Sequence, residues 1–280
     1  SGDGAVSLPR GEKHMLITQT KGSLEYLTAP HIAASHAFTT RLGGVSTGKL
    51  SSLNLGMSRG DDPEKVRQNY AILGSALGFD PHKVALARQI HSDIVYEVTE
   101  KDWGVGLYRG HLPDCDALVT NTPGTVLMVF TADCTPILFH DPVTGAVGGA
   151  RAGWRGTALG IAARVVEKME ALYGCKPEDL CCAVGPNIGQ CHFETDADVP
   201  QALLKAFGEE MNAFIEPRGE KFHVDLKGVN AWVLRRAGVK TIDVGTECTM
   251  CTPNRFWSHR VTQGHRGSQG AIILCGEAAK

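Results

Sequence analysis

Apolar residues recur at helical spacing in two long segments of the chain. In residues 61–78 they repeat every three or four positions, at Val66, Tyr70, Leu73 and Leu77. An aspartate at 61 or 62 followed by Pro63 is typical of a helix N-terminus. Residues 156–174 show the same periodicity and end at Gly174, which suits the left-handed conformation that often follows a helix. Two further helices are expected around residues 196–210 and 225–237.

Short apolar runs rich in β-branched residues predict strands, and turn sequences such as TPG and DPVTG separate them. The runs are KVALARQ, DIVYEVT, ALVTN, TVLMVFTA, PILFHD, AVGGA, LCCAVGP, TIDVG, RFWSHRV and AIILC. The strands come in clusters and do not alternate regularly with helices, which favours an α+β fold with mixed sheets over a doubly wound fold. We expect residues 1–20 to be a flexible lead-in and residues 21–280 to form a single domain. Within it, the Gly-, Ser- and Asn-rich residues 37–60 predict a long structured loop.

The composition narrows the class of protein. The net charge of −2 gives no basic surface for nucleic acid. No apolar run reaches the length needed to cross a bilayer, and the first residues lack the apolar core of a signal peptide. We therefore expect a cytoplasmic protein without nucleic-acid or membrane partners, whose oligomeric state the sequence leaves open.

Three segments carry the residue types of a functional site. They are RQIHSDIV with His91, FTADCTPILFHDP with Asp133 and Cys134, and GGARAGWRGT with Arg151 and Arg155. Reactive groups are often held at strand ends, and a thiol near a histidine can serve as a nucleophile or a metal ligand. Small residues before a helix, with arginines beside them, suit phosphate or carboxylate.

Each segment also has a structural interpretation, and the residues alone leave both open. His91 could be a buried hydrogen-bonded histidine, and Cys134 an inert thiol in a turn fixed by Pro136. One arginine of the third segment could simply pack over Trp154.

The cysteines are open to both a structural and a functional interpretation. The chain has nine, and most would be small buried apolar residues. The pair Cys248 and Cys251 has the C-x-x-C spacing of a metal or redox site, but no second such pair accompanies it.

Taken in order, seven motifs resemble the YfiH/YlmD family of laccase-domain proteins, also called multicopper polyphenol oxidases or peptidoglycan editing factors. The motifs are FTTRLGGVSTG…SSLNLG, QIHSDIV, DALVTNTPG, ADCTPILFHDP, AGWRGTALGI, AVGPNIGQCHFE and CTPNRFWSHR, and they extend over residues 36–275. The resemblance implies a mixed β-sandwich flanked by helices, related to cytotoxic necrotising factor. It also implies phosphorolysis of adenosine, inosine, guanosine and methylthioadenosine, and deamination of adenosine.

The resemblance further implies a zinc ion held by His, Cys and His. The first two ligands correspond to His91 and Cys134, but the family motif HAGWRG reads RAGWRG here, which places Arg151 at the third. Arginine has no free lone pair and stays charged, so it cannot bind zinc. Copper is not expected, because the sequence lacks the ligand pattern of a blue-copper centre.

Three interpretations of Arg151 follow. Another histidine could replace the lost ligand, with His192 as the first choice and His140 and His259 as further candidates. The pocket could instead work without metal, with Arg151 and Arg155 holding phosphate. Or the chain could be a weak or inactive family member that binds a nucleoside or a partner.

We predict a purine nucleoside-processing enzyme that uses His91 and Cys134, with Asp133 as an acid or base. Substrate or phosphate contacts are expected from Arg41, Asn54, Arg151 and Arg155. The alternatives are a non-catalytic binding protein, a copper-dependent phenol oxidase, and a Cys-His hydrolase of peptidoglycan-related amides, the last by fold analogy alone.

Overall fold

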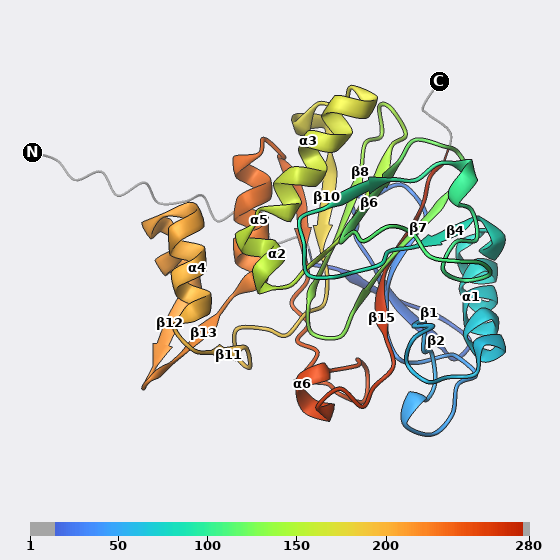
Figure 1. Cartoon of the computed structure of the whole chain (residues 1–280), viewed down its shortest axis with the longest axis horizontal. Coiled ribbons are helices and arrows are strands. Elements are labelled where there is room, and N and C mark those ends of the chain that lie inside the picture. Colours follow the sequence, from blue (N-terminus) through green and yellow to red (C-terminus); the bar gives the residue numbers. More distant parts are fainter. Residues whose placement is uncertain (1–14, 277–280) are drawn as a thin grey trace, which may run out of the picture.

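The computed structural model describes residues 15–276, and two six-stranded sheets form its centre (Figure 1). The first sheet has the order β1-β2-β3-β15-β7-β4. All its neighbours are antiparallel except β4 and β7. The strand bounds are β1 Ile17–Lys21, β2 Leu24–Thr28, β3 His36–Thr39, β4 Val84–Leu86, β7 Val126–Thr131 and β15 Gln269–Leu274.

The second sheet has the order β14-β10-β8-β9-β6-β5 and mixes parallel outer pairs with antiparallel inner ones. Its strands are β5 Val95–Glu97, β6 Ala117–Thr120, β8 Thr135–His140, β9 Val147–Ala152, β10 Cys181–Val184 and β14 Thr241–Val244. Strand β7 of the first sheet passes to β8 of the second through only three residues, 132–134. This short link holds Asp133 and Cys134 where the two sheets meet.

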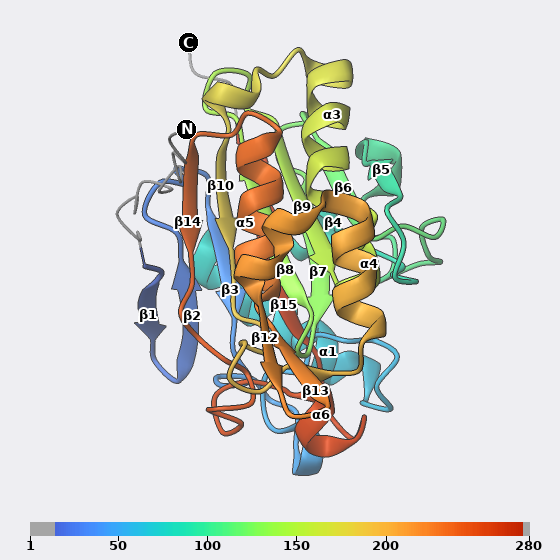
Figure 2. The same ribbon diagram turned by 90° about the vertical axis from the view of Figure 1, so that its left-hand side faces the viewer.

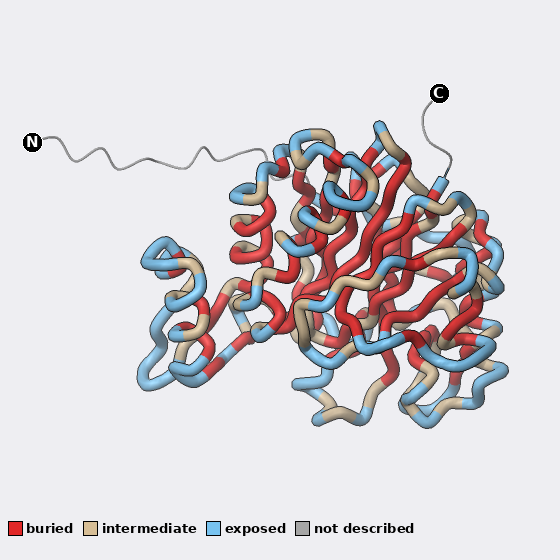
Figure 3. The backbone as a smooth tube through the Cα atoms, turned by 45° about the horizontal axis from the view of Figure 1, so that its top comes forward, coloured by how far each residue is buried: buried red, intermediate tan, exposed pale blue. Residues whose placement is uncertain are grey.

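Side chains alternate between faces along the strands, so each sheet buries one face against the other. Val129 of β7, Leu138 of β8 and Ala271 of β15 belong to the apolar cluster between the sheets, and all are at most 1% exposed. In Figure 3 these central strands are almost continuously buried, whereas most of the surrounding loops are exposed or intermediate.

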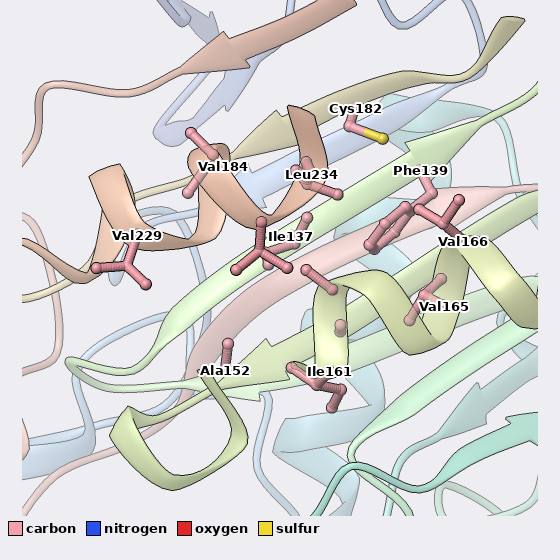
Figure 4. Packing of buried hydrophobic residues seen from close by; sticks show 14 of the residues in the cluster. Ile137, Phe139, Ala152, Ile161, Val165, Val166, Cys182, Val184, Val229 and Leu234 are labelled. Atoms are coloured by element: carbon pink, nitrogen blue, oxygen red, sulfur yellow. The ribbon is translucent and has the colours of Figure 1, made fainter. Parts of the chain in front are cut away.

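Helices cover the outer faces of both sheets. α1 (Pro63–Leu77) packs on the first sheet, while α3 (Ile161–Tyr173) and α5 (Leu226–Arg236) pack on the second (Figure 2). Figure 4 shows Ile161, Val165 and Val166 of α3 packing over Ile137 and Phe139 of β8. None of the helices within residues 15–276 is long and apolar enough to span a membrane.

Smaller elements complete the fold. A three-stranded sheet is formed by β11 (Glu194–Thr195), β13 (Lys221–Val224) and β12 (Ile215–Arg218). The remaining α-helices are α2 (Trp154–Ala158), α4 (Asp198–Phe207) and α6 (His259–Thr262). The 3-10 helices are η1 (Gly48–Leu50), η2 (Pro81–Lys83), η3 (Glu100–Asp102), η4 (Pro177–Asp179) and η5 (Glu209–Phe214).

The predicted mixed α+β class and its flanking helices are confirmed. The helix predicted over 61–78 spans Pro63–Leu77, with the Asp62 side chain accepting a hydrogen bond from the amide of Glu64. The helix predicted over 156–174 is two helices, because Gly160 takes a left-handed conformation between them. Gly174 does end the second one, with φ of 68°.

Two boundary predictions need correction. Residues 17–20, expected in a flexible lead-in, belong to β1, while residues 1–14 lie outside the described range. The run RFWSHRV, predicted as a strand, is a loop leading into α6. Ser258 caps that helix by accepting a hydrogen bond from the amide of Val261, and the amide of Trp257 donates to the side chain of Gln269. Local capping therefore replaces strand pairing in this segment.

Candidate functional site

A cavity of about 740 Å³ opens beside the β7–β8 link. Its wall combines the loop before α1, the segment after β4, the link itself, β9 and the segment from α6 to β15. The charged or hydrogen-bonding side chains in the wall are Ser58, Arg59, Arg88, Gln89, His91, His111, Thr131, Asp133, Cys134, Arg151, His259, Arg260, Arg266 and Ser268. This volume suits a small organic substrate such as a nucleoside.

The buried carboxylate of Asp116 organises one side of the cavity. It accepts hydrogen bonds from the amides of Ile90, His91 and Ser92, at 2.8–3.2 Å, and from the Ser92 hydroxyl at 2.8 Å. Nε and a terminal nitrogen of Arg151 each lie 2.8 Å from its Oδ2. Burial alone would raise the pKa of Asp116, but these hydrogen bonds and the charge of Arg151 outweigh it and leave that pKa below its ordinary value.

The side chains of His91 and Cys134 lie close together beside the backbone of Gly153. A Cβ atom at Gly153 would come within 2.9 Å of His91 Nδ1 and 3.3 Å of Cys134 Sγ. His91 and Asp133 both have positive φ, 64° and 95°. Such conformations are uncommon for residues other than glycine and are often found at functional sites.

The surroundings shift the pKa values of His91 and Cys134 toward their uncharged forms. Partial burial and then the charge of Arg151 lower the pKa of His91. Burial raises the pKa of the Cys134 thiol, against the opposing effect of Arg151. These surroundings favour the thiol form of Cys134 over the thiolate.

The donor set around this pair does not fit the three-ligand zinc site that the family resemblance implies. His91 and Cys134 offer two donors, and the third position holds the guanidinium of Arg151, which Asp116 fixes in place. Among residues 15–276, no group of three or more potential ligand atoms converges on this pair. Two protein ligands and an adjacent cation do not make a zinc site.

His192, the candidate replacement ligand, is placed elsewhere. Its Nδ1 lies among the sulfur atoms of Cys191, Cys248 and Cys251, and it does not line the cavity. His140 is in β8 and also lies outside the cavity lining. His259 does line the cavity, where its Nδ1 is 3.5 Å from a terminal nitrogen of Arg266.

Asp133 lines the cavity, but both of its carboxylate oxygens are engaged. Oδ1 accepts a hydrogen bond from the Thr249 hydroxyl at 2.6 Å, and Oδ2 accepts one from the amide of Arg260 at 2.7 Å. The carboxylate thus joins the β7–β8 link to two later segments of the chain. This geometry suits a positioning role better than the predicted acid or base.

Three other predicted contacts lie outside the cavity lining. Arg41 packs over the ring of Trp257 and donates to two carbonyl oxygens, and Arg155 packs over Trp154. Asn54 is fully buried, and its Oδ1 accepts hydrogen bonds from the amides of Gly56 and Ser268, which do line the cavity. Asn54 therefore shapes the wall from behind.

Sequence reasoning missed the pair Arg59 and Arg266. Arg59 donates hydrogen bonds to the carbonyl oxygens of Gly264 and Arg266. These bonds hold the loop that carries Arg266. Burial and the charge of Arg59 lower the pKa of Arg266 to about 10. Within residues 15–276 neither guanidinium has a carboxylate within 4.0 Å, and Nε of Arg266 is buried without a hydrogen-bond partner. No local motif marks these residues, because 207 positions separate them in the sequence.

Comparison with known proteins agrees with the resemblance. A family described as "Multi-copper polyphenol oxidoreductase laccase" matches residues 35–276. A Deinococcus radiodurans protein named purine nucleoside phosphorylase is 41% identical over 254 residues, covering 91% of this chain and 94% of its own length. Purine nucleoside phosphorylase YlmD of Geobacillus stearothermophilus is 35% identical, covering 91% and 95%. A YlmD crystal structure from that organism superposes with a TM-score of 0.86 at 34% identity, covering 94% of this chain and all of the other.

Proposed function

Since the chain belongs to the multi-copper polyphenol oxidoreductase laccase family, in which relatives are named purine nucleoside phosphorylases, we propose that it cleaves purine nucleosides with phosphate. One observation carries the proposal: Arg59 and Arg266 both line the cavity, and within residues 15–276 neither has a carboxylate oxygen within 4.0 Å. Arg59 and Arg266 face the same space, with His259 beside them.

Phosphate is the natural occupant of such a site. The positive charge of Arg59 lowers the pKa of Arg266, which means that the two guanidinium groups repel each other. An anion bound between them would relieve that repulsion. Charge-assisted hydrogen bonds from arginine to phosphate are also directional, which orients the nucleophile. Asp133 is the sole acidic residue in the described lining, so little opposes the anion.

The reaction needs little from the protein beyond placement and one proton. A phosphate oxygen attacks C1′ of the ribose as the bond to the purine breaks through an oxocarbenium-like state, giving ribose 1-phosphate. The departing purine must take up a proton. The Cys134 thiol and the neutral His91 ring stand in the cavity wall with Asp116 fixing the His91 backbone, so this pair is assigned to the base side of the substrate.

The proposal covers phosphorolysis of adenosine, inosine, guanosine and methylthioadenosine, and not deamination. Replacement of an amino group by water needs an activated water, and among residues 15–276 no group of three potential metal ligands includes His91 or Cys134. The Arg151–Asp116 pair also favours a second candidate, a binding protein that retains the pocket but not turnover.

The test measures release of free base from the four nucleosides, with and without phosphate, by chromatography. Arg266→Gln is expected to raise the phosphate KM at least about tenfold and to change the nucleoside KM much less, because a charged hydrogen bond contributes about 1.5–3 kcal/mol. Arg236→Gln, exposed on α5 and packed over Trp232, is the matched control.

No base release with phosphate from any of the four nucleosides would overturn the proposal. Tight nucleoside binding without product would then support the binding protein. Release that does not depend on phosphate would indicate a hydrolase, and phenol oxidation after copper loading would revive the oxidase alternative.

A further inference from the structure

Four potential metal ligands lie close together, two in the segment that follows β10 and two in the segment that follows β14. We propose that Cys191, His192, Cys248 and Cys251 bind a zinc ion in a closed tetrahedral site, separate from the cavity. The Sγ atoms of the three cysteines and Nδ1 of the histidine all lie within 4.8 Å of one another. Among the described residues, this is the one group of three or more such side chains that could hold a metal.

Four of the six separations among these ligand atoms are close to the edges of a zinc-centred tetrahedron, and the other two are within 4.8 Å. Bonds of about 2.3 Å to sulfur and about 2.0 Å to nitrogen place sulfur atoms about 3.8 Å apart, and sulfur and nitrogen about 3.5 Å apart. The sulfurs of Cys191 and Cys251 are 3.6 Å apart. Nδ1 of His192 lies 3.2 Å from Cys191, 3.4 Å from Cys251 and 3.7 Å from Cys248.

The backbone around the ligands is built to bring them together. The amides of His192 and Phe193 donate to the carbonyl oxygen of Gly189, which forms a tight turn. The amide of Gly189 in turn donates to Cys248 Sγ at 3.2 Å, an interaction that favours a thiolate. A Cβ atom at Gly189 would lie 3.2–3.5 Å from Cys248 and 3.3 Å from the sulfur of Cys191, so a side chain there would crowd the ligands.

The chemistry of the ligands selects the metal and its role. Three thiolates and an imidazole suit zinc and disfavour magnesium or calcium, which take oxygen ligands. Four protein ligands leave no open position for water or substrate, so the site is structural. Cys191 and Cys251 are exposed at the surface, where a metal can enter, while Cys248 is buried.

The metal would join two segments that form part of the cavity wall. Thr249, between two of the ligands, donates its hydroxyl to Asp133, and its amide donates to the carbonyl oxygen of Asn187. Phe193, next to His192, lines the cavity and packs under the guanidinium of Arg260. Holding these segments together thus fixes the position of Asp133 beside Cys134. The inference stands without the proposed function, since it concerns metal binding and local stability.

The experiment is elemental mass spectrometry on the whole chain, purified without affinity metal and reconstituted with Zn²⁺ under reducing conditions. We expect about one zinc ion per chain in the wild type and none in the Cys191→Ser/Cys251→Ser double variant. Cys181→Ser, at a half-buried cysteine in β10, is the matched control and should keep its zinc. Cys134→Ser should also keep it, which separates this site from the cavity.

Thermal unfolding and cobalt spectra guard against a variant that fails to fold. Added zinc should raise the Tm of the wild type and leave that of the double variant unchanged. Cobalt should give a thiolate charge-transfer band in the wild type that weakens in Cys251→Ser. The proposal is overturned if the reconstituted wild type holds no zinc, if the double variant retains it, or if Cys134→Ser loses it. The proposal would also be overturned if Cys191 and Cys251 form a disulfide and the reduced protein takes up no zinc.

Discussion

At the scale of single residues, Arg151 decides what the cavity can hold. The family resemblance places a metal ligand at this position, and the structure shows a guanidinium paired with the buried carboxylate of Asp116. The same carboxylate fixes the backbone of Ile90, His91 and Ser92. The ion pair therefore couples residue 151 to the placement of His91, which the sequence alone could not show because 35 positions separate Asp116 from Arg151.

Arg151→His is expected to create a zinc site in the cavity. It restores a third donor beside His91 and Cys134, which already converge on Gly153. Elemental analysis should find about one more zinc ion per chain than in the wild type, and Cys134→Ser in the same background should remove that extra ion. An unchanged metal content would show that the two remaining ligands are not placed for zinc.

Gly153 is expected to tolerate no side chain. An added Cβ would lie 2.9 Å from His91 Nδ1, so Gly153→Ala must displace the ring and should lower kcat/KM at least about tenfold. The control is Gly156→Ala, whose Cβ would meet its nearest atom, a backbone oxygen of Ser92, at 3.3 Å. The measurement is the activity of both glycine variants with inosine. If Gly153→Ala and Gly156→Ala lower kcat/KM equally, displacement of the His91 ring is not the cause.

At the scale of elements, β3 depends on a neutral histidine. His36 is buried, and its Nε2 accepts a hydrogen bond from the amide of Ala29 while Nδ1 lies 2.7 Å from the carbonyl oxygen of Ala34. Burial lowers the pKa of His36 from 6.5, and His140 adds to the effect while Ala34 and Asp243 oppose it. Protonation would remove the acceptor that Ala29 uses.

The free energy of unfolding should consequently fall in mild acid. The unfolded chain protonates His36 near pH 6.5, whereas the folded chain resists protonation until the lower folded pKa. The stabilisation is thus present above pH 6.5 and lost as the pH falls toward the folded pKa. Urea unfolding between about pH 7.5 and pH 5.5 should show a smaller decrease in His36→Gln than in the wild type. His82→Gln, at an exposed histidine, should behave like the wild type, and equal slopes in all three proteins would contradict the prediction.

Also at this scale, sequence periodicity predicted the elements that local capping and an apolar face stabilise. It failed where the conformation of a segment depends on contacts with distant residues. The helix over 61–78 carries its own cap and apolar face, so the sequence located it closely. The run RFWSHRV has strand-like composition, but its backbone bonds to Gln269 and its own Ser258 cap replace a neighbouring strand. β-propensity describes suitability for a sheet and not the presence of a partner strand.

At the scale of the whole molecule, stability depends on the apolar layer between the two sheets. Leu138 of β8 lies within it, fully buried. Leu138→Ala should lower the free energy of unfolding by about 2–5 kcal/mol, because it removes apolar contacts and leaves a cavity. Denaturant titration should show a lower midpoint with an unchanged slope. Leu172→Ala, at a side chain 42% exposed on α3, should change the free energy of unfolding by less than about 0.5 kcal/mol. A similar loss in both variants would contradict the conclusion that stability depends mainly on the apolar layer between the sheets.

The sequence by itself determined the mixed α+β class, most helices and central strands, and the segments that hold His91, Cys134 and Arg151. These features follow from short-range periodicity, capping and motif order. Only the tertiary structure decided that Arg59 meets Arg266, that Asp116 pairs with Arg151, and that His192 joins Cys191, Cys248 and Cys251 instead of His91. Such contacts join residues far apart in the chain, and they are set by how the sheets and loops pack, which no local pattern encodes.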